Sequence, residues 1–201
     1  KTIFLLTAPE AGTRSISSLR IIAPMFTSRI TVAVQRQAGE VLAADLVWRS
    51  GRPASAELRA SAADFNLKTA NVSSFPSMAW AGDEGSLAEV RAVDDAYPLR
   101  GTILVADKLF GESSATNAVP RSGEAWAEAR LLARLGLEPG DTLRLGELDL
   151  VVGRVLERLP DQGFQFVDLA PTLLVNQADI GPSGLLGPGS RVTYRLLFSG
   201  E

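Results

Sequence analysis

The sequence contains no histidine and no cysteine. Histidine is the usual general base near neutral pH, and Ser–His and Cys–His nucleophile systems depend on it. Zinc, copper and iron–sulfur sites also draw mainly on histidine and cysteine side chains. These absences argue against most hydrolase mechanisms and most transition-metal sites. A carboxylate site for Mg²⁺ or Ca²⁺, a Ser–Lys pair and a two-carboxylate glycosidase stay open.

Long apolar runs and an excess of basic residues are also missing. No run of about 18 apolar residues occurs, so the sequence predicts no membrane-spanning helix. The 20 basic and 23 acidic residues give a net charge of −3, which argues against general nucleic-acid binding. The hydrophobic fraction of 46% and the charged fraction of 21% are typical of a globular domain, so a folded core is expected.

The first part of the chain gives weak signals and then a helical pattern. Residues 1–27 show no clear pattern and are interpreted as a leader or an added segment. After Ser28, which can cap a helix, apolar residues recur at helical spacing over residues 28–42. This spacing predicts an amphipathic helix.

The next segment predicts alternating strands and one helix. A strand is expected over residues 44–49 and a helix over residues 55–67, with Ser55 as its cap. Residues 68–81 are strand-like, with an expected interruption at Pro76. Apolar residues at 88, 90 and 92 then alternate with Glu89 and Arg91, which predicts a strand with one buried and one polar face.

The second half predicts a helix, a hairpin and a final strand. A leucine-rich helix should end at Gly136, and a hairpin over residues 142–152 should turn at Gly146 and Glu147, with a bulge at Gly153. Residues 111–123 and 181–189 read as loops, and residues 191–198 as a strand. Together these elements predict an α+β fold in which a sheet packs against two or three helices.

Few residues suggest chemistry. Asp94 and Asp95 are adjacent, which makes a metal site conceivable, although turn-forming carboxylates are the favoured interpretation. The glycine-rich stretch 181–189 lacks the pattern of a phosphate-binding loop. We therefore predict no catalytic, cofactor-binding or metal-binding residue. Phe164 and Phe166 follow a turn and are either core residues or an exposed patch that contacts a partner.

Several stretches together resemble a known family. The most specific are Val93–Gly101 and Pro188–Arg195; shorter ones are Ala43–Val47, Ser74–Met78, Arg130–Leu132, Gly140–Thr142, Pro160–Asp161 and Asn176–Asp179. In this order and spacing they resemble the first periplasmic domain of the YbbP-type predicted ABC permeases, within the FtsX/MacB-like group. The resemblance runs from about Ser28 to Ser199.

This resemblance implies a domain of a bacterial inner-membrane protein that faces the periplasm. It implies a MacB-like periplasmic core, with one lobe from about 28–98 plus 164–199 and an inserted, smaller β-rich lobe over about 99–163. ATP would be hydrolysed by a separate cytoplasmic subunit, so this chain would need no cofactor and would not be an enzyme. The domain would couple motion of its own transmembrane helices to a hydrophobic or lipid-like cargo or to a periplasmic protein.

Within this interpretation, the helix over 28–42 would be a stalk and the last strand would lead back to the membrane. Both ends of the domain should then lie on one face. The first alternative is a binding module for a protein or small ligand, which an apolar pocket with converging polar groups would favour. The second is a carboxylate enzyme, which would need two acidic groups about 5–9.5 Å apart across a cleft.

Overall fold

The structure is a computed structural model that describes residues 43–162, 170–187 and 189–200. The leader segment 1–27, the predicted helix over 28–42 and the candidate patch of Phe164 and Phe166 lie outside the described residues.

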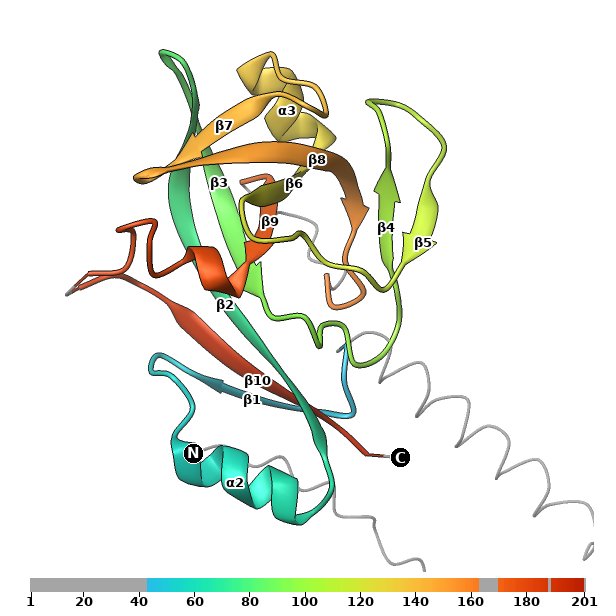
Figure 1. The fold of residues 1–201 in the computed structure, drawn as a ribbon, viewed down its shortest axis with the longest axis vertical. Coiled ribbons are helices and arrows are strands. Elements are labelled where there is room, and N and C mark those ends of the chain that lie inside the picture. Colours follow the sequence, from blue (N-terminus) through green and yellow to red (C-terminus); the bar gives the residue numbers. More distant parts are fainter. Residues whose placement is uncertain (1–42, 163–169, 188, 201) are drawn as a thin grey trace, which may run out of the picture. The chain divides into compact units, whose positions relative to one another are not determined.

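The described strands form one ten-stranded mixed sheet (Figure 1). Their order is β1-β10-β2-β3-β9-β6-β8-β4-β5, and β7 pairs with both β2 and β8. The pairs β3–β9 and β6–β8 are parallel, and the others are antiparallel. The strands are β1 (Leu46–Ser50), β2 (Lys68–Ala81), β3 (Glu84–Val93), β4 (Ile103–Ala106), β5 (Ser114–Thr116), β6 (Glu124–Glu128), β7 (Thr142–Leu145), β8 (Leu148–Arg158), β9 (Thr172–Asn176) and β10 (Thr193–Ser199). With two α-helices in the described part of the chain, this arrangement is compatible with the α+β prediction.

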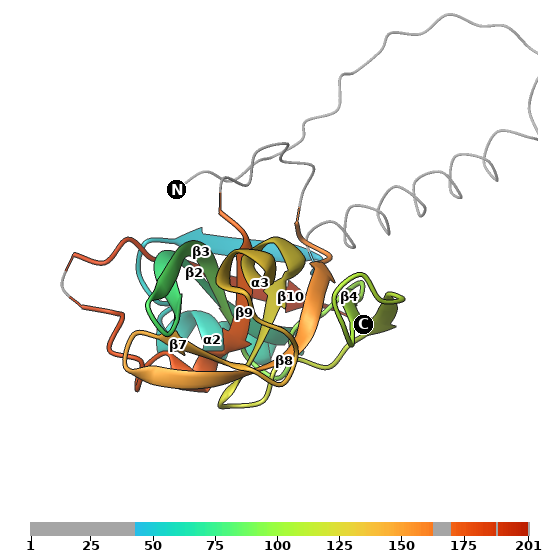
Figure 2. The ribbon, with the colours of Figure 1, turned by 90° about the horizontal axis from the view of Figure 1, so that it is seen from above.

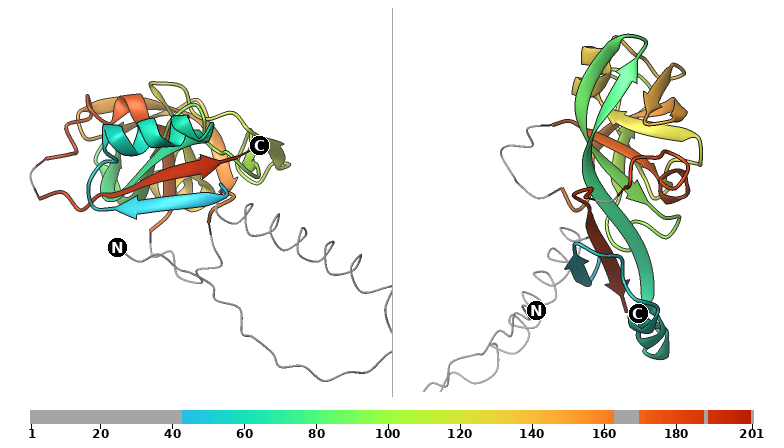
Figure 3. Two further views of the ribbon diagram at one scale, coloured as in Figure 1. Left: turned by 90° about the horizontal axis from the view of Figure 1, so that it is seen from below. Right: turned by 90° about the vertical axis from the view of Figure 1, so that its left-hand side faces the viewer.

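The strands β2 and β3 form a long hairpin that runs along one side of the domain (Figure 3). The predicted interruption at Pro76 is wrong, because β2 continues through it for 14 residues. Strand β10 pairs with β2 only as far as Ser74, and β7 pairs with it only from Ala79. Pro76 therefore lies where β2 is paired on one side only, and such a position tolerates a residue without a backbone N–H.

The helix α2 (Ala56–Asp64) begins as predicted. The hydroxyl of Ser55 accepts a hydrogen bond from the backbone N–H of Leu58, which satisfies a donor that the first turn leaves free. The helix ends three residues earlier than predicted, because Asn66 adopts a left-handed conformation with φ +53° and turns the chain into β2. Leu58 and Ala62 pack with Leu196 and Phe198 of β10 in a small apolar cluster.

The helix α3 (Ala129–Leu135) covers the opposite end of the domain from α2 (Figures 1 and 2). Its leucines Leu131, Leu132 and Leu135 are buried in the largest apolar core, with side chains from the β2–β3 hairpin and from β6 to β9. Gly136 ends the helix with φ +65°, as predicted, and its N–H donates to the carbonyl of Leu132.

The predicted hairpin and bulge are both present. Leu145 lies opposite Leu148 across the Gly146–Glu147 turn. Ala125 and Trp126 of β6 lie opposite Val152 and Arg154 of β8, which leaves Gly153 as the extra residue of a bulge.

The predicted loop 111–123 contains a short strand, which the sequence did not show. Residues Ser114–Thr116 pair with Ile103–Val105 of β4 as the edge strand β5. The segment Ser-Ala-Thr carries no large apolar residue, so its strand conformation depends on pairing with β4 and leaves no alternating pattern in the sequence.

Candidate functional site

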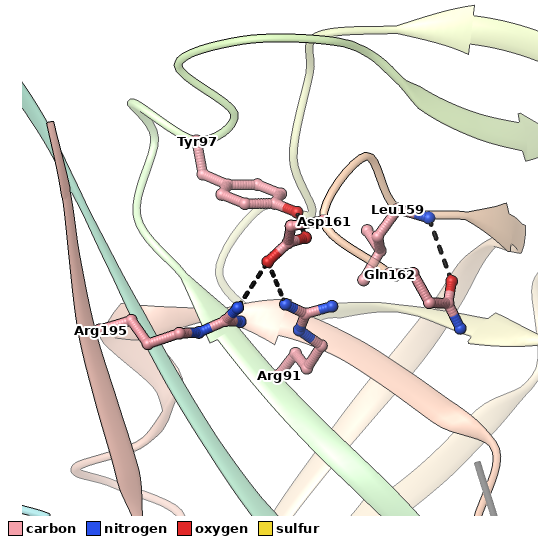
Figure 4. Close-up of polar contacts among 6 residues, drawn as sticks. All are labelled: Arg91, Tyr97, Leu159, Asp161, Gln162 and Arg195. Atoms are coloured by element: carbon pink, nitrogen blue, oxygen red, sulfur yellow. Dashed lines mark hydrogen bonds and ion pairs between the residues drawn. The ribbon is translucent and has the colours of Figure 1, made fainter. Parts of the chain in front are cut away.

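The buried carboxylate of Asp161 is the centre of the main polar site (Figure 4). Asp161 lies in the turn that follows β8, and its side chain is only 3% exposed. Arg91 from β3, Tyr97 from the loop after β3 and Arg195 from β10 all point toward it. We call these four residues the Asp161 cluster.

Both oxygens of the Asp161 carboxylate are used. Arg195 Nη1 donates to Oδ2 at 2.6 Å, and Arg91 Nη2 donates to the same oxygen. The Tyr97 hydroxyl donates to Oδ1 at 2.5 Å. A buried carboxylate is tolerated only when it is paired and hydrogen-bonded, and this one has three donors. The cluster therefore ties β3, β10 and the end of β8 together.

The charges of the cluster do not cancel, because two guanidinium groups share one carboxylate. Burial alone would raise the pKa of Asp161, but the charges of Arg91 and Arg195 outweigh it and hold this pKa below its ordinary value. Burial, followed by repulsion from Arg91, lowers the pKa of Arg195. Arg91 Nε is buried without a hydrogen-bond partner. The cluster thus carries one excess positive charge in a largely buried position.

Tyr97 completes the site as a donor. Its ring is buried, and burial together with the neighbouring Asp161 carboxylate raises its pKa well above the ordinary value of 10.0. The hydroxyl therefore stays protonated and can keep donating to Asp161.

The sequence did not predict this cluster. Arg91 was expected on a polar face of β3, but it is buried, because β3 is an inner strand with an apolar core on each side. Pro160 and Asp161 were noted only as a shared motif. The one signal for the cluster in the sequence is an arginine between two largely apolar neighbours. Arg91 and Arg195 both have this position.

A second polar group joins the beginning and the end of the described domain. Arg100 Nε and Nη2 each donate to an oxygen of Asp45 at 3.0 Å, and Nη2 also donates to the carbonyl of Gly200 at 2.7 Å. The N–H of Gly200 donates to Asp45 at 3.0 Å, and the N–H of Arg100 donates to the carbonyl of Ala43 at 2.9 Å. We call Asp45, Arg100 and Gly200 the end clamp.

The end clamp is exposed. The side chains of Arg100 and Asp45 are 41% and 46% exposed, so their pairing adds little to overall stability. The hydrogen bond from Arg100 lowers the pKa of Asp45, which keeps that carboxylate ionised. What the clamp fixes is position: it holds the first described residues, the last ones and the segment that leads into β4 against one another.

Asp94 and Asp95 do not form a shared site. Asp94 accepts hydrogen bonds from the backbone and side-chain nitrogens of Asn71 at 2.7 and 2.6 Å, whereas Asp95 accepts from Asn176 at 3.3 Å. Each carboxylate is thus used to fix neighbouring strands. Within the described ranges, no group of three or more acidic side chains gathers in a way that would hold a metal ion.

A cleft lies beside the cluster. It has a volume of about 340 Å³, and its lining comes from β1, α2, β2, β10, η1 (Gln177–Asp179) and the segments before α2 and β10. The lining residues are Trp48, Pro53, Ala54, Arg59, Asn71, Val72, Ser73, Gln177, Leu186, Tyr194 and Arg195. Arg195 therefore belongs both to this cleft and to the Asp161 cluster.

Comparison with known proteins gives one clear relative. No model of a known protein family matches the chain. Over 176 residues, which is 87% of the chain, it is 34% identical to an uncharacterised ABC transporter permease of Escherichia coli K12. This similarity relates the chain to one part of an ABC-transporter permease. That relative is YbbP, and the chain belongs to the YbbP-type permease family, as the sequence motifs indicated.

The chain spans about a fifth of the length of this relative, 21%. No helix in the described part of the chain is long and apolar enough to cross a membrane.

Proposed function

We propose that this domain is the periplasmic part of an ABC-transporter permease subunit. In this role it couples ATP-driven motion of membrane helices to the movement of a hydrophobic or lipid-like cargo, or to an envelope protein. The observation that carries the proposal is the position of the two ends. Strands β1 and β10 are antiparallel neighbours, and Leu46 at the start of β1 lies opposite Phe198 near the end of β10.

Adjacent ends are what a domain inserted between two membrane helices requires. A displacement of either end acts first on the β1–β10 pair, and the end clamp carries it to Arg100 and into the segment before β4. The proposed division into a lobe of about 28–98 plus 164–199 and an inserted lobe of about 99–163 fits this route, with the insert as the part that moves. The fold would then be a MacB-like periplasmic core, with the helix over 28–42 as stalk.

The proposal assigns ATP hydrolysis to a separate cytoplasmic subunit and no catalysis to this domain. Its first test is the gene sequence on both sides of residues 1–201. We expect an apolar run of about 20 residues shortly after Glu201 and another before residue 28. A stop codon directly after Glu201, with no apolar run upstream, would make the domain a free protein and remove the basis for coupling.

The second test concerns the end clamp. In a permease carrying this domain, reconstituted with its ATPase in proteoliposomes, Arg100→Gln should lower the stimulation of ATP hydrolysis by cargo. Asp45→Asn should lower it too, and the two losses should not add up in the double variant, because both variants break the Arg100–Asp45 pair. Arg121→Gln is the matched control, since this arginine is exposed and is not part of the clamp. Full coupling in Arg100→Gln would show that the clamp transmits nothing.

The cleft beside the Asp161 cluster favours a second candidate function, a binding module. Its walls combine apolar side chains with several polar groups, which is the composition of small-molecule sites. The two functions are compatible, because a permease domain can bind a ligand.

A further inference from the structure

The cleft has a one-sided charge. Where the structure describes its lining, the cleft has two arginines, Arg59 and Arg195, and no aspartate or glutamate, although the chain as a whole has a net charge of −3. Arginine is the side chain best suited to oxyanions, because its guanidinium presents several N–H groups in one plane. A cleft with this composition repels cations and attracts anions.

The neighbouring cluster strengthens this preference. Arg91 and Arg195 share the single carboxylate of Asp161, so among the described residues of the cluster one positive charge is left over beside the cleft. Arg195 keeps 18% of its side chain exposed, and burial lowers its pKa. An anion bound in the cleft would offset the excess charge, and the low local dielectric would make this attraction stronger than in water.

Neutral polar groups and apolar walls complete the cleft. The Ser73 hydroxyl donates to the side-chain oxygen of Gln177 at 3.1 Å. The amide nitrogen of Gln177 can then donate to a ligand. Tyr194 adds a hydroxyl. The rest of the lining is mainly apolar: Trp48, Pro53, Ala54, Val72 and Leu186. A ligand that fits has a charged end and an apolar body.

The volume limits the size of this ligand. About 340 Å³ lies near the lower end of the range of small-molecule sites, about 300–1,000 Å³. We propose that the cleft binds a small amphiphile with one oxyanionic head, a phosphate or a carboxylate, whose apolar part lies against Trp48 and Leu186. This inference does not depend on the transport role, because binding can be measured on the chain alone.

The test uses three probes on the 201-residue protein by calorimetric titration: octyl phosphate, octanol and inorganic phosphate. Octyl phosphate should bind most tightly. In NMR spectra of the same titration, octyl phosphate should shift the indole N–H resonance of Trp48, which a Trp48→Phe variant identifies. Arg59→Gln should weaken the binding of octyl phosphate about tenfold, because it removes one charge-assisted interaction. Arg59 is exposed on α2, so this variant keeps the core intact.

Arg134→Gln is the matched control. It makes the same change of charge on α3, at the opposite end of the domain from α2, which carries Arg59, and should leave the affinity unchanged (Figure 1). Equal affinity for octanol would overturn the requirement for an anion, and equal affinity for inorganic phosphate would overturn the requirement for an apolar body. Equal weakening by Arg59→Gln and Arg134→Gln would show non-specific attraction and overturn the site, as would the absence of binding by all three probes.

Discussion

Arg195 Nη1 lies 2.6 Å from Asp161 Oδ2, and this contact links the last strand of the domain to the turn that follows β8. Arg91 binds the same carboxylate from the centre of the sheet. Three segments that are distant in the sequence are thereby fixed at one buried point. The cluster is therefore where a substitution should have the largest effect on how β10 is held against the rest of the sheet.

Asp161→Asn should destabilise the protein strongly. The variant keeps the shape of the side chain but leaves two buried guanidinium groups without a negative partner, and such a loss costs about 3–5 kcal/mol. The free energy of unfolding in urea measures the effect. Asp107→Asn is the matched control. Asp107 is 86% exposed, and its pair with Arg154 is long, at 3.6 Å, so the variant should change stability by less than about 1 kcal/mol. Equal losses in the two variants would contradict the role assigned to the cluster.

The stabilisation by Asp161 should depend on pH in the acid range. Its pKa in the folded protein is below the ordinary value of 3.8, so the unfolded chain takes up the proton first as the pH falls. The contribution is complete above about pH 3.8 and is lost as the pH falls toward the folded pKa. The difference in unfolding free energy between the unchanged protein and Asp161→Asn should shrink over this window. A difference that stays constant down to low pH would rule out an ionised Asp161.

Tyr97 should ionise late. Burial and the Asp161 carboxylate raise its pKa well above 10.0, so its contribution to stability is complete below pH 10 and is lost as the pH rises above it. The chain has two tyrosines. A titration followed by phenolate absorbance should therefore show a component far above pH 10 that is missing in Tyr97→Phe. If that variant retained the late component, the hydroxyl of Tyr97 would be exposed in solution.

The features that the sequence predicted well depend on neighbours in the chain. Ser55 caps a helix through a hydrogen bond to a backbone N–H three residues away, and Gly136 ends a helix. These need only local rules. The Asp161 cluster could not be predicted in this way, because its contacts span 70 residues to Arg91 and 34 to Arg195, and only the strand order brings them together.

The strand order could not be predicted from the sequence for the same reason. Parallel pairs such as β3–β9 and β6–β8 are not joined by a hairpin, so no turn in the sequence indicates that these strands pair. Once β3 is an inner strand, its polar side is no longer a surface, and Arg91 must be buried with a partner. The burial of this one residue therefore follows from a pairing about 80 residues further along the chain, as Arg91 lies beside Leu174.

The last prediction concerns two glycines in two-residue hairpin turns. Gly82 and Gly146 have φ +56° and +62°, a left-handed conformation that costs alanine about 1–2 kcal/mol. At Gly82 a Cβ atom would meet nothing within 4 Å, whereas at Gly146 it would lie 2.2 Å from the carbonyl oxygen of Ser183. That carbonyl also accepts a hydrogen bond from Glu147 N at 3.0 Å, so it is held in place.

Gly82→Ala should therefore lower the free energy of unfolding by about 1–2 kcal/mol, and Gly146→Ala by roughly 1–3 kcal/mol more. The difference between the two variants isolates the steric contact, because the backbone conformation is nearly the same in both turns. Urea unfolding measures both losses. If the two losses were equal, the segment that carries Ser183 would not rest on the β7–β8 turn in solution. A larger loss in Gly146→Ala would mean that this segment, which leads from η1 toward β10 and includes Leu186 of the cleft, is held by the turn.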